Sequence, residues 1–174
     1  PVGMMKEIVR CRSALTPYFN DVHDRTPYNF KRHAIQSSLY GADIDLGAVE
    51  IAKLRLWLSL VVDEENVQQI KPLPNLDYKI VAGNSLIGIE IDALNDYMTV
   101  QIEKEKDSLF DETDADKKAE HKKTIDVLIN TLTHGMKVFD FELFFSEVFH
   151  KKDGFDVIIA NPPYVKEQGH KEIF

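Results

Sequence analysis

The sequence predicts an α/β fold with a parallel sheet that is interrupted by a long helical insert. Short apolar strands are expected near residues 38–45, 78–82 and 154–160, and an amphipathic helix follows the first of them. The third strand is continuously apolar, as expected in a parallel sheet that is covered on both faces. Between the second and third strands, residues 91–139 are rich in charge and have helical periodicity.

Composition narrows the possible classes of function. A chain of 174 residues with 44% hydrophobic residues has room for one domain with a core, which excludes disorder throughout. The net charge of −8 excludes a self-sufficient nucleic-acid clamp, because phosphate binding needs a surplus of Lys and Arg. Cys11 is the single cysteine and the histidines show no ligand spacing, so we expect no metal site. The absence of an apolar run of ~20 residues predicts no membrane span, and a reducing cytoplasm fits the cysteine usage.

The helices before the insert follow from periodicity and capping. A first helix over residues 2–15 ends before Pro17, because the position before a proline disfavours helix. A short helix over residues 28–37 leads into the first strand. Asp45 is a good N-cap for the next helix, over residues 46–62. The second half of that helix is apolar nearly all round, so we expect it to be deeply packed.

The insert is expected to be a hairpin of two helices with solvated, charged faces. Thr113 and Asp116 form a possible capping box at the start of its second helix. The chain therefore divides into a cofactor-side part of the core (1–90), the insert (91–139) and a return to the core (140–174). The apolar stripe of the second helix of the insert consists of Ile125, Leu128, Ile129, Leu132, Met136 and Phe139.

Asn161-Pro162-Pro163-Tyr164, directly after the third predicted strand, is the strongest chemical signal. The Asn161 side chain and the Pro162 carbonyl offer two acceptors to one –NH₂ group, which favours the geometry in which its lone pair is free to attack. The prolines fix the backbone, so these acceptors are preorganised. Tyr164 supplies a flat face for stacking a base that has been extracted from its helix. The alternative is a Pro-Pro turn with an N-cap asparagine.

Two further patterns point to a nucleoside-bearing ligand at the carboxyl ends of the first two strands. Asp43 ends the first strand with a carboxylate that suits ribose hydroxyls, and Ile44 offers an apolar face to an adenine. Gly83-Asn84-Ser85 follows the second strand, where Asn84 suits an adenine edge. Alone, the Asp43 pattern is weak because strand-Gly-x-Asp occurs in many α/β proteins, and the Asn84 pattern is equally consistent with a Gly-Asn turn. The three signals in this order are much more specific than any one of them.

These residues resemble the class I S-adenosylmethionine-dependent methyltransferases that act on the exocyclic amine of adenine in DNA. The resemblance rests on residues 38–62, 83–86 and 155–164. It is closest to the large enzymes of restriction–modification and phage-defence systems, including type IIG fusions of methyltransferase and endonuclease. It implies a partial Rossmann-like class I methyltransferase core.

The resemblance also implies a role for each candidate residue. Asp43 would bind the ribose of S-adenosylmethionine, with Ile44, Asn84 and Ser85 completing the cofactor site. Asn84 stands where relatives often have Asp, and an amide can both donate and accept. Residues 161–164 would hold the target amine and stack on the flipped adenine. No metal is required, and Mg²⁺ would serve only a fused nuclease.

Two parts of the family pattern are not found in the sequence: the Gly-rich cofactor loop and the target recognition domain. Both ends of the chain look cut, so we expect an internal segment of a methyltransferase domain that is inactive alone. Double-stranded DNA would bind through domains outside this chain. The first strand of the fold would be missing too. The strands near 39–43 and 155–160 would then have unpaired edges, which favours a homodimer.

Two alternatives belong to other classes. A protein glutamine N5-methyltransferase also uses Asn-Pro-Pro-Tyr on a planar amide, but the helical insert and the aromatic stretch 139–149 favour the DNA enzyme. The other alternative is a non-catalytic fragment that only packs against partners. Titration with S-adenosylmethionine separates a competent site from a scaffold.

Overall fold

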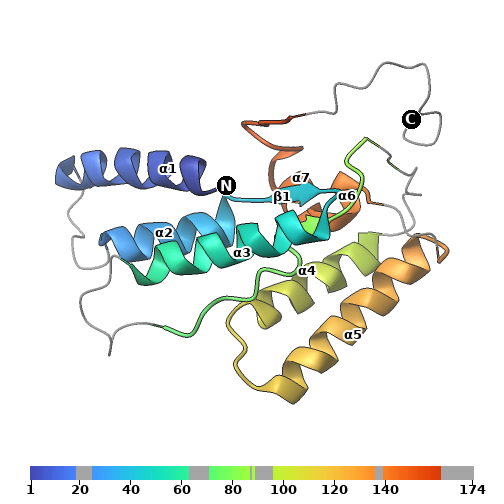
Figure 1. Ribbon diagram of the computed structural model, residues 1–174. Helices are drawn as coiled ribbons and strands as arrows, with labels where there is room; N and C mark the ends of the chain where they lie inside the picture. Colours follow the sequence, from blue (N-terminus) through green and yellow to red (C-terminus); the bar gives the residue numbers. More distant parts are fainter. Residues whose placement is uncertain (19–24, 63–70, 87, 89–95, 136–138, 162–174) are drawn as a thin grey trace.

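Helices surround a small parallel sheet in this protein (Figure 1). The structure is a computed structural model, and it describes residues 1–18, 25–62, 71–86, 88, 96–135 and 139–161. This mixed architecture is compatible with the predicted α/β fold.

The sheet consists of strands β1 (Gly41–Asp43) and β2 (Ile80–Ala82). They run parallel, with Asp43 opposite Ala82 at their carboxyl ends. Parallel neighbours need a crossover connection, and helix α3 (Leu46–Val61) lies in it. The first two predicted strands are therefore confirmed.

The chain begins with helix α1 (Val2–Leu15), followed by a 3-10 turn η1 (Thr16–Tyr18) and helix α2 (Pro27–Ser37). Helix α2 starts where local chemistry favours it. The Thr26 hydroxyl accepts a hydrogen bond from the Asn29 amide at 3.1 Å, and a proline occupies the first turn. Both predicted helices are confirmed.

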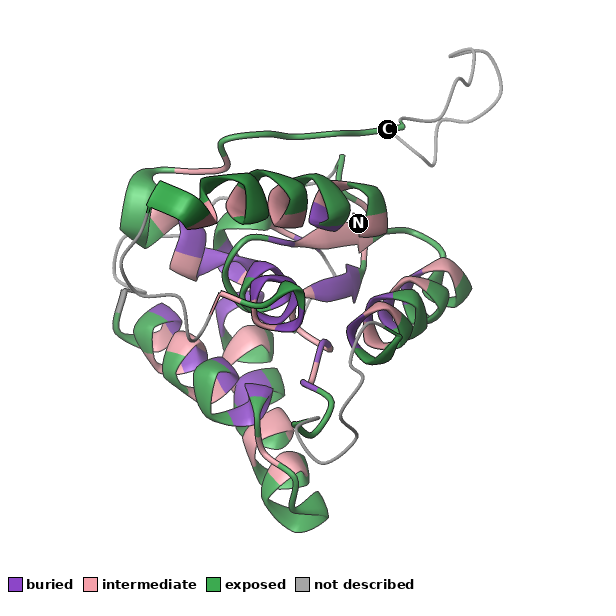
Figure 2. Cartoon of the chain, turned by 90° about the vertical axis from the view of Figure 1, so that its left-hand side faces the viewer, coloured by how far each residue is buried: buried purple, intermediate pink, exposed green. Residues whose placement is uncertain are grey.

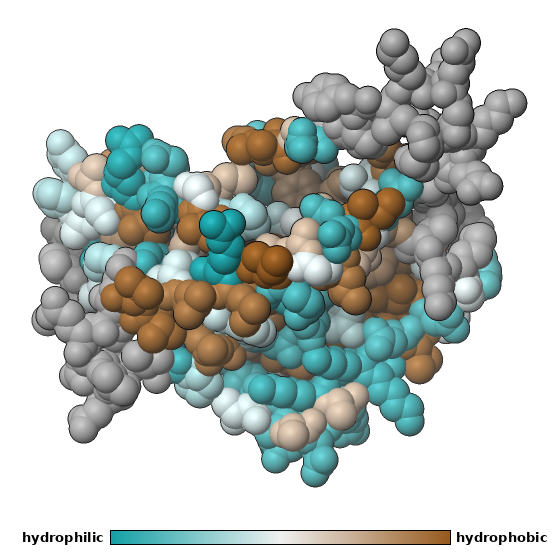
Figure 3. Space-filling model, viewed as in Figure 1, coloured by the Kyte–Doolittle hydropathy of each residue, from teal (hydrophilic) through white to brown (hydrophobic). Residues whose placement is uncertain are grey.

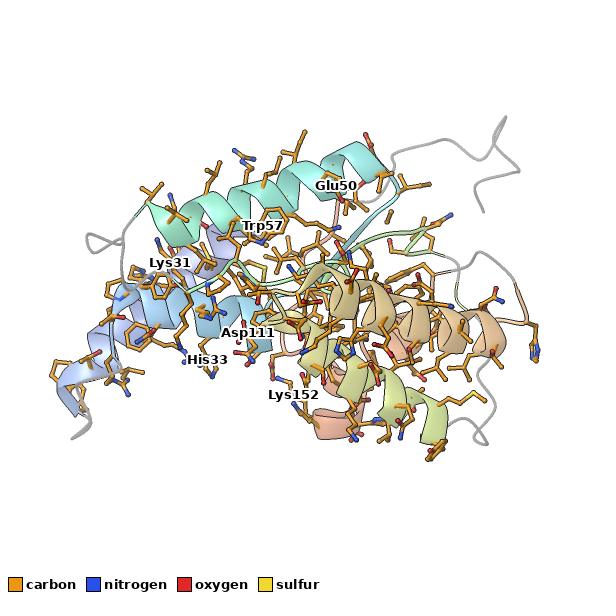
Figure 4. The ribbon with its side chains drawn as sticks, turned by 90° about the horizontal axis from the view of Figure 1, so that it is seen from below. Lys31, His33, Glu50, Trp57, Asp111 and Lys152 are labelled. Carbon is orange, nitrogen blue, oxygen red and sulfur yellow. The ribbon has the colours of Figure 1, made fainter. Side chains whose placement is uncertain are left out.

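Helix α3 is capped as predicted, because an Asp45 carboxylate oxygen accepts a hydrogen bond from the Gly47 amide at 2.7 Å. Trp57 extends from α3 toward the rest of the molecule (Figure 4), and its indole donates to the Pro74 carbonyl at 2.8 Å. The inner face of the helix carries the buried residues Val49, Lys53, Leu56 and Leu60.

The prediction that the second half of α3 is deeply packed is wrong. Leu54, Leu58 and Val62 are exposed, and Figure 3 shows hydrophobic side chains gathered along this helix. A helix that is apolar all round is buried all round only when a second layer covers its outer face. No part of the chain that the structure describes forms such a layer over these side chains.

The insert forms the predicted hairpin of two helices, α4 (Asp96–Phe110) and α5 (Ala115–Leu132). The predicted capping box of Thr113 and Asp116 is wrong. Asp114, not Thr113, caps α5 by accepting hydrogen bonds from the amides of Asp116 and Lys117, each at 3.0 Å. Aspartate is the stronger N-cap of the two, which accounts for the shift.

The predicted stripe of α5 is shorter than expected. Ile125 and Leu132 are buried and Leu128 and Ile129 are partly buried, but the helix ends at Leu132. His134, with φ +51°, and Gly135, with φ +77°, then both adopt the left-handed conformation that ends the helix. Of the remaining two stripe residues, Met136 lies outside the described residues and Phe139 packs elsewhere, against Val81 and Phe145.

After the insert the chain forms two short helices, α6 (Phe141–Phe144) and α7 (Ser146–Lys152). Phe139, Phe145 and Val148 pack with Val81 of β2 in one hydrophobic cluster. The aromatic stretch is thus attached to the sheet. Figure 2 shows that buried positions gather where the helices and the sheet face one another.

The third predicted strand is wrong in this structure. Residues 155–160 form no strand, and Val157, Ile158 and Ile159 are exposed, Ile158 by 75%. In Figure 2 this stretch runs along the outside of the molecule toward the C-terminus. A strand forms only where a neighbour takes its backbone hydrogen bonds, and no described residue pairs with this segment.

Candidate functional site

The register of the sheet places two of the predicted patterns at one edge. Because Asp43 lies opposite Ala82, the turns that follow β1 and β2 leave the sheet side by side. The Gly83 amide donates to the Asp43 carbonyl at 2.9 Å, which joins the two turns directly. The structure therefore places the turn with Asp43 and Ile44 next to the turn with Asn84 and Ser85.

Asp43 presents an exposed carboxylate at this edge. One of its oxygens, Oδ1, accepts a hydrogen bond from the Asp45 amide at 2.9 Å, which fixes the orientation of the side chain. The neighbouring Asp45 caps α3, whereas the Asp43 carboxylate is the candidate ligand-binding group. Ile44 lies between them with its side chain 72% exposed, as a residue offering an apolar face to a ligand must be.

Asn84 is half-buried and makes a local turn, in which its Oδ1 accepts a hydrogen bond from the Leu86 amide at 3.1 Å. The turn that the sequence left open as an alternative is therefore present. It occupies the oxygen of the amide and leaves the –NH₂ group without an acceptor among the described residues. That group can donate to a ring nitrogen or a hydroxyl of a ligand. Ser85 is exposed beside it.

Gly83 is needed at the end of β2 because an aromatic ring packs on it. A Cβ atom at this position would lie 2.4 Å from Cβ and 2.8 Å from Cγ of Phe139. Any side chain would force the ring away. This contact attaches the first residue described after the insert hairpin to the start of the Asn84 turn.

Of the Asn161 motif, the structure describes only the first residue. Asn161 itself is exposed, at the end of the extended segment. Pro162, Pro163 and Tyr164 lie outside the described residues. No hydrogen bond joins Asn161 to Asp43 or Asn84 within the part of the chain that is described, so the role of this motif stays a prediction.

A largely buried group of ionisable side chains, which we call the Glu147 cluster, lies at the amino ends of β1 and β2, the opposite end of the sheet from Asp43 and Asn84. Its members are Tyr40, Lys79, Lys106 and Glu147. Lys79 donates to the Tyr40 hydroxyl at 2.7 Å and to Glu147 Oε1 at 3.0 Å. Lys106 donates to Glu147 Oε2 at 3.1 Å and to the Phe144 carbonyl at 2.6 Å. The side chains of Lys79 and Glu147 are each 13% exposed and that of Lys106 is 6% exposed.

Burial dominates the protonation equilibria in the Glu147 cluster. It lowers the pKa of both Lys79 and Lys106, since the charged amine loses hydration, although Glu147 opposes the change. Burial also raises the pKa of the Tyr40 hydroxyl, and the nearby Glu147 charge adds to this shift. For Glu147, burial favours the neutral acid, but Lys106 and Lys79 outweigh it and its pKa is lowered.

Part of this cluster had a signal in the sequence that we did not use. Lys79 interrupts the apolar strand Tyr78-Lys-Ile-Val-Ala82, and Glu147 interrupts the aromatic stretch 139–149. A charged residue inside an apolar element is a candidate for a buried, paired group. Lys106 had no such signal, because it lies among many charged residues that were expected to be solvated.

The other described parts of the chain hold fewer groups that could bind a metal or another ligand. No group of three or more His, Cys, Asp or Glu side chains that could hold a metal ion occurs in the described ranges. A shallow hollow on α5 is lined by Lys122, Lys123 and Asp126, far along the chain from the predicted site residues. None of the helices described is long and apolar enough to cross a membrane.

Comparison with known proteins adds a family match. Residues 37–173 match the model of a family described as "Eco57I restriction-modification methylase". A protein of Methanocaldococcus jannaschii named "Putative type II restriction enzyme and methyltransferase RM.MjaORFECS2P" is 38% identical over 91 residues. That match covers 50% of this chain and 8% of the relative. No solved structure is significantly similar to the chain.

Proposed function

Because the chain belongs to the Eco57I restriction-modification methylase family, we propose that it is a segment of a DNA methyltransferase. The proposed reaction transfers a methyl group from S-adenosylmethionine to the exocyclic N6 amine of adenine. The proposed substrate is double-stranded DNA bound through parts of the protein outside this chain, since the net charge here is −8.

The observation that carries the proposal is the pair of turns at the carboxyl edge of β1 and β2. Open α/β sheets bind ligands at this edge. The exposed Asp43 carboxylate suits ribose hydroxyls, and the –NH₂ group of Asn84 suits a ring nitrogen of adenine. Together with the exposed Ile44 beside Asp43, these side chains suit a nucleoside such as the adenosine of S-adenosylmethionine.

The cofactor supplies a methyl group on a sulfonium, which is a good leaving group. The residues of this chain therefore act mainly by positioning. Asn161 and the Pro162 carbonyl would accept the two N–H bonds of the target amine. The lone pair of the amine is then released from the ring and directed at the methyl group. Tyr164 would stack on the flipped base and exclude water.

The M. jannaschii relative is named both a restriction enzyme and a methyltransferase. We extend this to the present protein as a type IIG arrangement, in which one polypeptide carries both activities. Mg²⁺ would then serve the nuclease part alone, because methyl transfer from a sulfonium needs no metal.

The test separates the two halves of the proposed site in the full-length protein. Asn161→Ala is expected to lower the rate of adenine methylation about 100- to 1,000-fold, the usual effect of removing one transition-state contact, while the Kd for S-adenosylmethionine stays within a few-fold. Asp43→Ala is expected to raise that Kd at least about tenfold, since charged hydrogen bonds are lost. Asn130→Ala, which replaces an exposed asparagine on α5, is the matched control.

Two results would contradict the proposal. One is near-normal methylation of DNA by Asn161→Ala. The other is methylation of a glutamine-containing peptide but not of adenine in DNA by the unmodified protein, which would assign the chain to the glutamine methyltransferases instead.

A further inference from the structure

The Glu147 cluster joins the elements that lead to both halves of the proposed site. Tyr40 lies directly before β1, which ends at Asp43, and Lys79 lies directly before β2, which precedes Asn84. Glu147 belongs to α7, the last helix before Asn161. One carboxylate therefore contacts, through Lys79, the strand that leads to the cofactor edge.

Aromatic packing continues this connection toward Asn161. The Tyr40 ring lies 5.0 Å from that of Phe145 and 5.5 Å from that of Phe155, measured between centroids. Phe155 also contacts Phe145 and Phe149 edge-on, at 5.9 Å each. The segment 155–161 thus starts from a residue that is held against Tyr40, while the rest of the segment is exposed.

The hydrogen bonds of Glu147 specify this arrangement more closely than apolar packing alone. Each of its two oxygens accepts from a different lysine, and each lysine also donates to a second group: Lys79 to the Tyr40 hydroxyl and Lys106 to the Phe144 carbonyl. Directional bonds in a largely desolvated site fix the rotation and translation of α7, because each alternative position leaves a buried charge unpaired.

We propose that Glu147 is a positioning residue, which sets the place of the segment leading to Asn161 relative to the Asp43–Asn84 edge. This inference rests on the proposed function. It adds that the insert helix α4, through Lys106, takes part in aligning the target amine with the methyl group. A misplacement of about 1 Å is enough to lower such a transfer about 100-fold.

The test compares two changes to the Glu147 cluster in the full-length protein. Glu147→Gln keeps the shape but removes the charge, so two lysines lose their counter-ion. We expect it to lower Tm by roughly 10 °C, and to lower the single-turnover rate of methyl transfer about 100-fold with the Kd for S-adenosylmethionine within about threefold. Glu142→Gln, an exposed carboxylate of α6, is the matched control and should leave all three values unchanged.

The second change is the combined variant Lys79→Met, Lys106→Met and Glu147→Met, which replaces the ions by apolar side chains of similar length. Such replacements commonly restore or increase stability, so we expect Tm to return to the wild-type value. The hydrogen bonds that position α7 are still missing, so the transfer rate should stay about 100-fold low. Recovery of the rate together with Tm would overturn the proposal, because Glu147 would then be only structural.

A distance measurement keeps the inference separate from the proposed function. In a Cys11→Ser background, because Cys11 is itself exposed, spin labels on cysteines introduced at Ile51 of α3 and at Val157, both exposed, report the separation of the two halves without any methyl transfer. The expected result is a narrow distance distribution in the wild type and a broadened or shifted one in the combined variant. An unchanged distribution overturns the positioning role, whereas absence of methylation with a changed distribution contradicts only the proposed reaction.

Discussion

Two regions of this protein reverse the usual relation between residue type and burial. In the Glu147 cluster, three charged side chains are largely removed from water. On the outer face of α3 and along residues 157–159, aliphatic side chains are exposed. The difference shows that burial depends on which segments cover a residue. Charged groups are buried here where three elements converge and can pair them, while apolar groups stay exposed where no described layer covers them.

Helix α3 contains both situations and gives the largest expected effect. Leu56 is 1% exposed and Leu58 is 62% exposed. Leu56→Ala should lower the free energy of unfolding by about 2–5 kcal/mol, since it leaves a cavity. Leu58→Ala should change it by less than about 0.5 kcal/mol. Urea denaturation monitored by circular dichroism measures both, and similar losses for the two variants would show that the outer face of α3 is covered in solution.

Gly83 tests the packed region at its closest contact. Gly83→Ala places a methyl group against Phe139 and should lower the free energy of unfolding by about 1–3 kcal/mol. Gly3→Ala in α1 is the control, because its new Cβ meets nothing within 4 Å. That change should raise stability by about 0.5–1 kcal/mol. If Gly83→Ala left the free energy of unfolding unchanged, the Phe139 ring would have to lie away from the end of β2.

The exposed apolar residues should cause a protein of residues 1–174 to self-associate. The outer edges of β1 and β2 have no strand partner among the described residues, and such edges pair readily with other chains. We expect a dimer in size-exclusion chromatography with light scattering. Ile158→Lys should weaken it about tenfold, because a lysine opposes pairing of the exposed apolar segment 157–159 with a free strand edge of a second copy, whereas Leu58→Lys on α3 should leave it unchanged. A monomeric wild-type chain would contradict this expectation, and a larger effect of Leu58→Lys would move the interface to α3.

The smallest effect concerns a partly exposed ion pair. Burial favours the neutral form of Asp77, but hydrogen bonds from Lys122 and Lys53 outweigh it, and the pKa of Asp77 is lowered. The stability that this carboxylate contributes is therefore present above its unfolded pKa near 3.8 and is lost as pH falls through the lower folded value.

Asp77→Asn should accordingly reduce the loss of stability below about pH 4. The reduction should be less than about 1 kcal/mol, because solvent partly screens the ion pairs of Asp77. Thermal unfolding across pH 2–6 measures it. Glu142→Gln serves as the control for loss of an exposed carboxylate. If stability fell at low pH as steeply in Asp77→Asn as in the wild type, this result would contradict the lowered pKa of Asp77.

The elements that the sequence predicted correctly depend on local interactions. The Asp45 cap, the helix before Pro17 and the insert hairpin each follow from residues a few positions apart. The shared edge of Asp43 and Asn84 was predictable for a similar reason, since the carboxyl ends of neighbouring parallel strands lie together.

The errors concern properties that no short segment determines. The apolar side chains of residues 155–160 indicate that this segment can be buried, but a strand also needs a neighbouring strand that takes its backbone hydrogen bonds. The apolar side chains on the outer face of α3 likewise become buried only where a second layer covers them. The Glu147 cluster escaped prediction because it forms only when four distant segments meet, and the contact between Asn161 and the sheet edge stays a prediction.

The spacing of the Glu147 cluster along the chain has a consequence for the order of folding. Its bonds join residues 39, 68 and 41 positions apart, whereas α4 and α5 are consecutive helices with extensive mutual contacts. Closing long loops costs entropy before any contact compensates for it. We therefore expect the insert hairpin to form early and the ion cluster to close near the end. φ-values close to zero at Glu147 and well above zero along the α4–α5 contact are the expected kinetic signature.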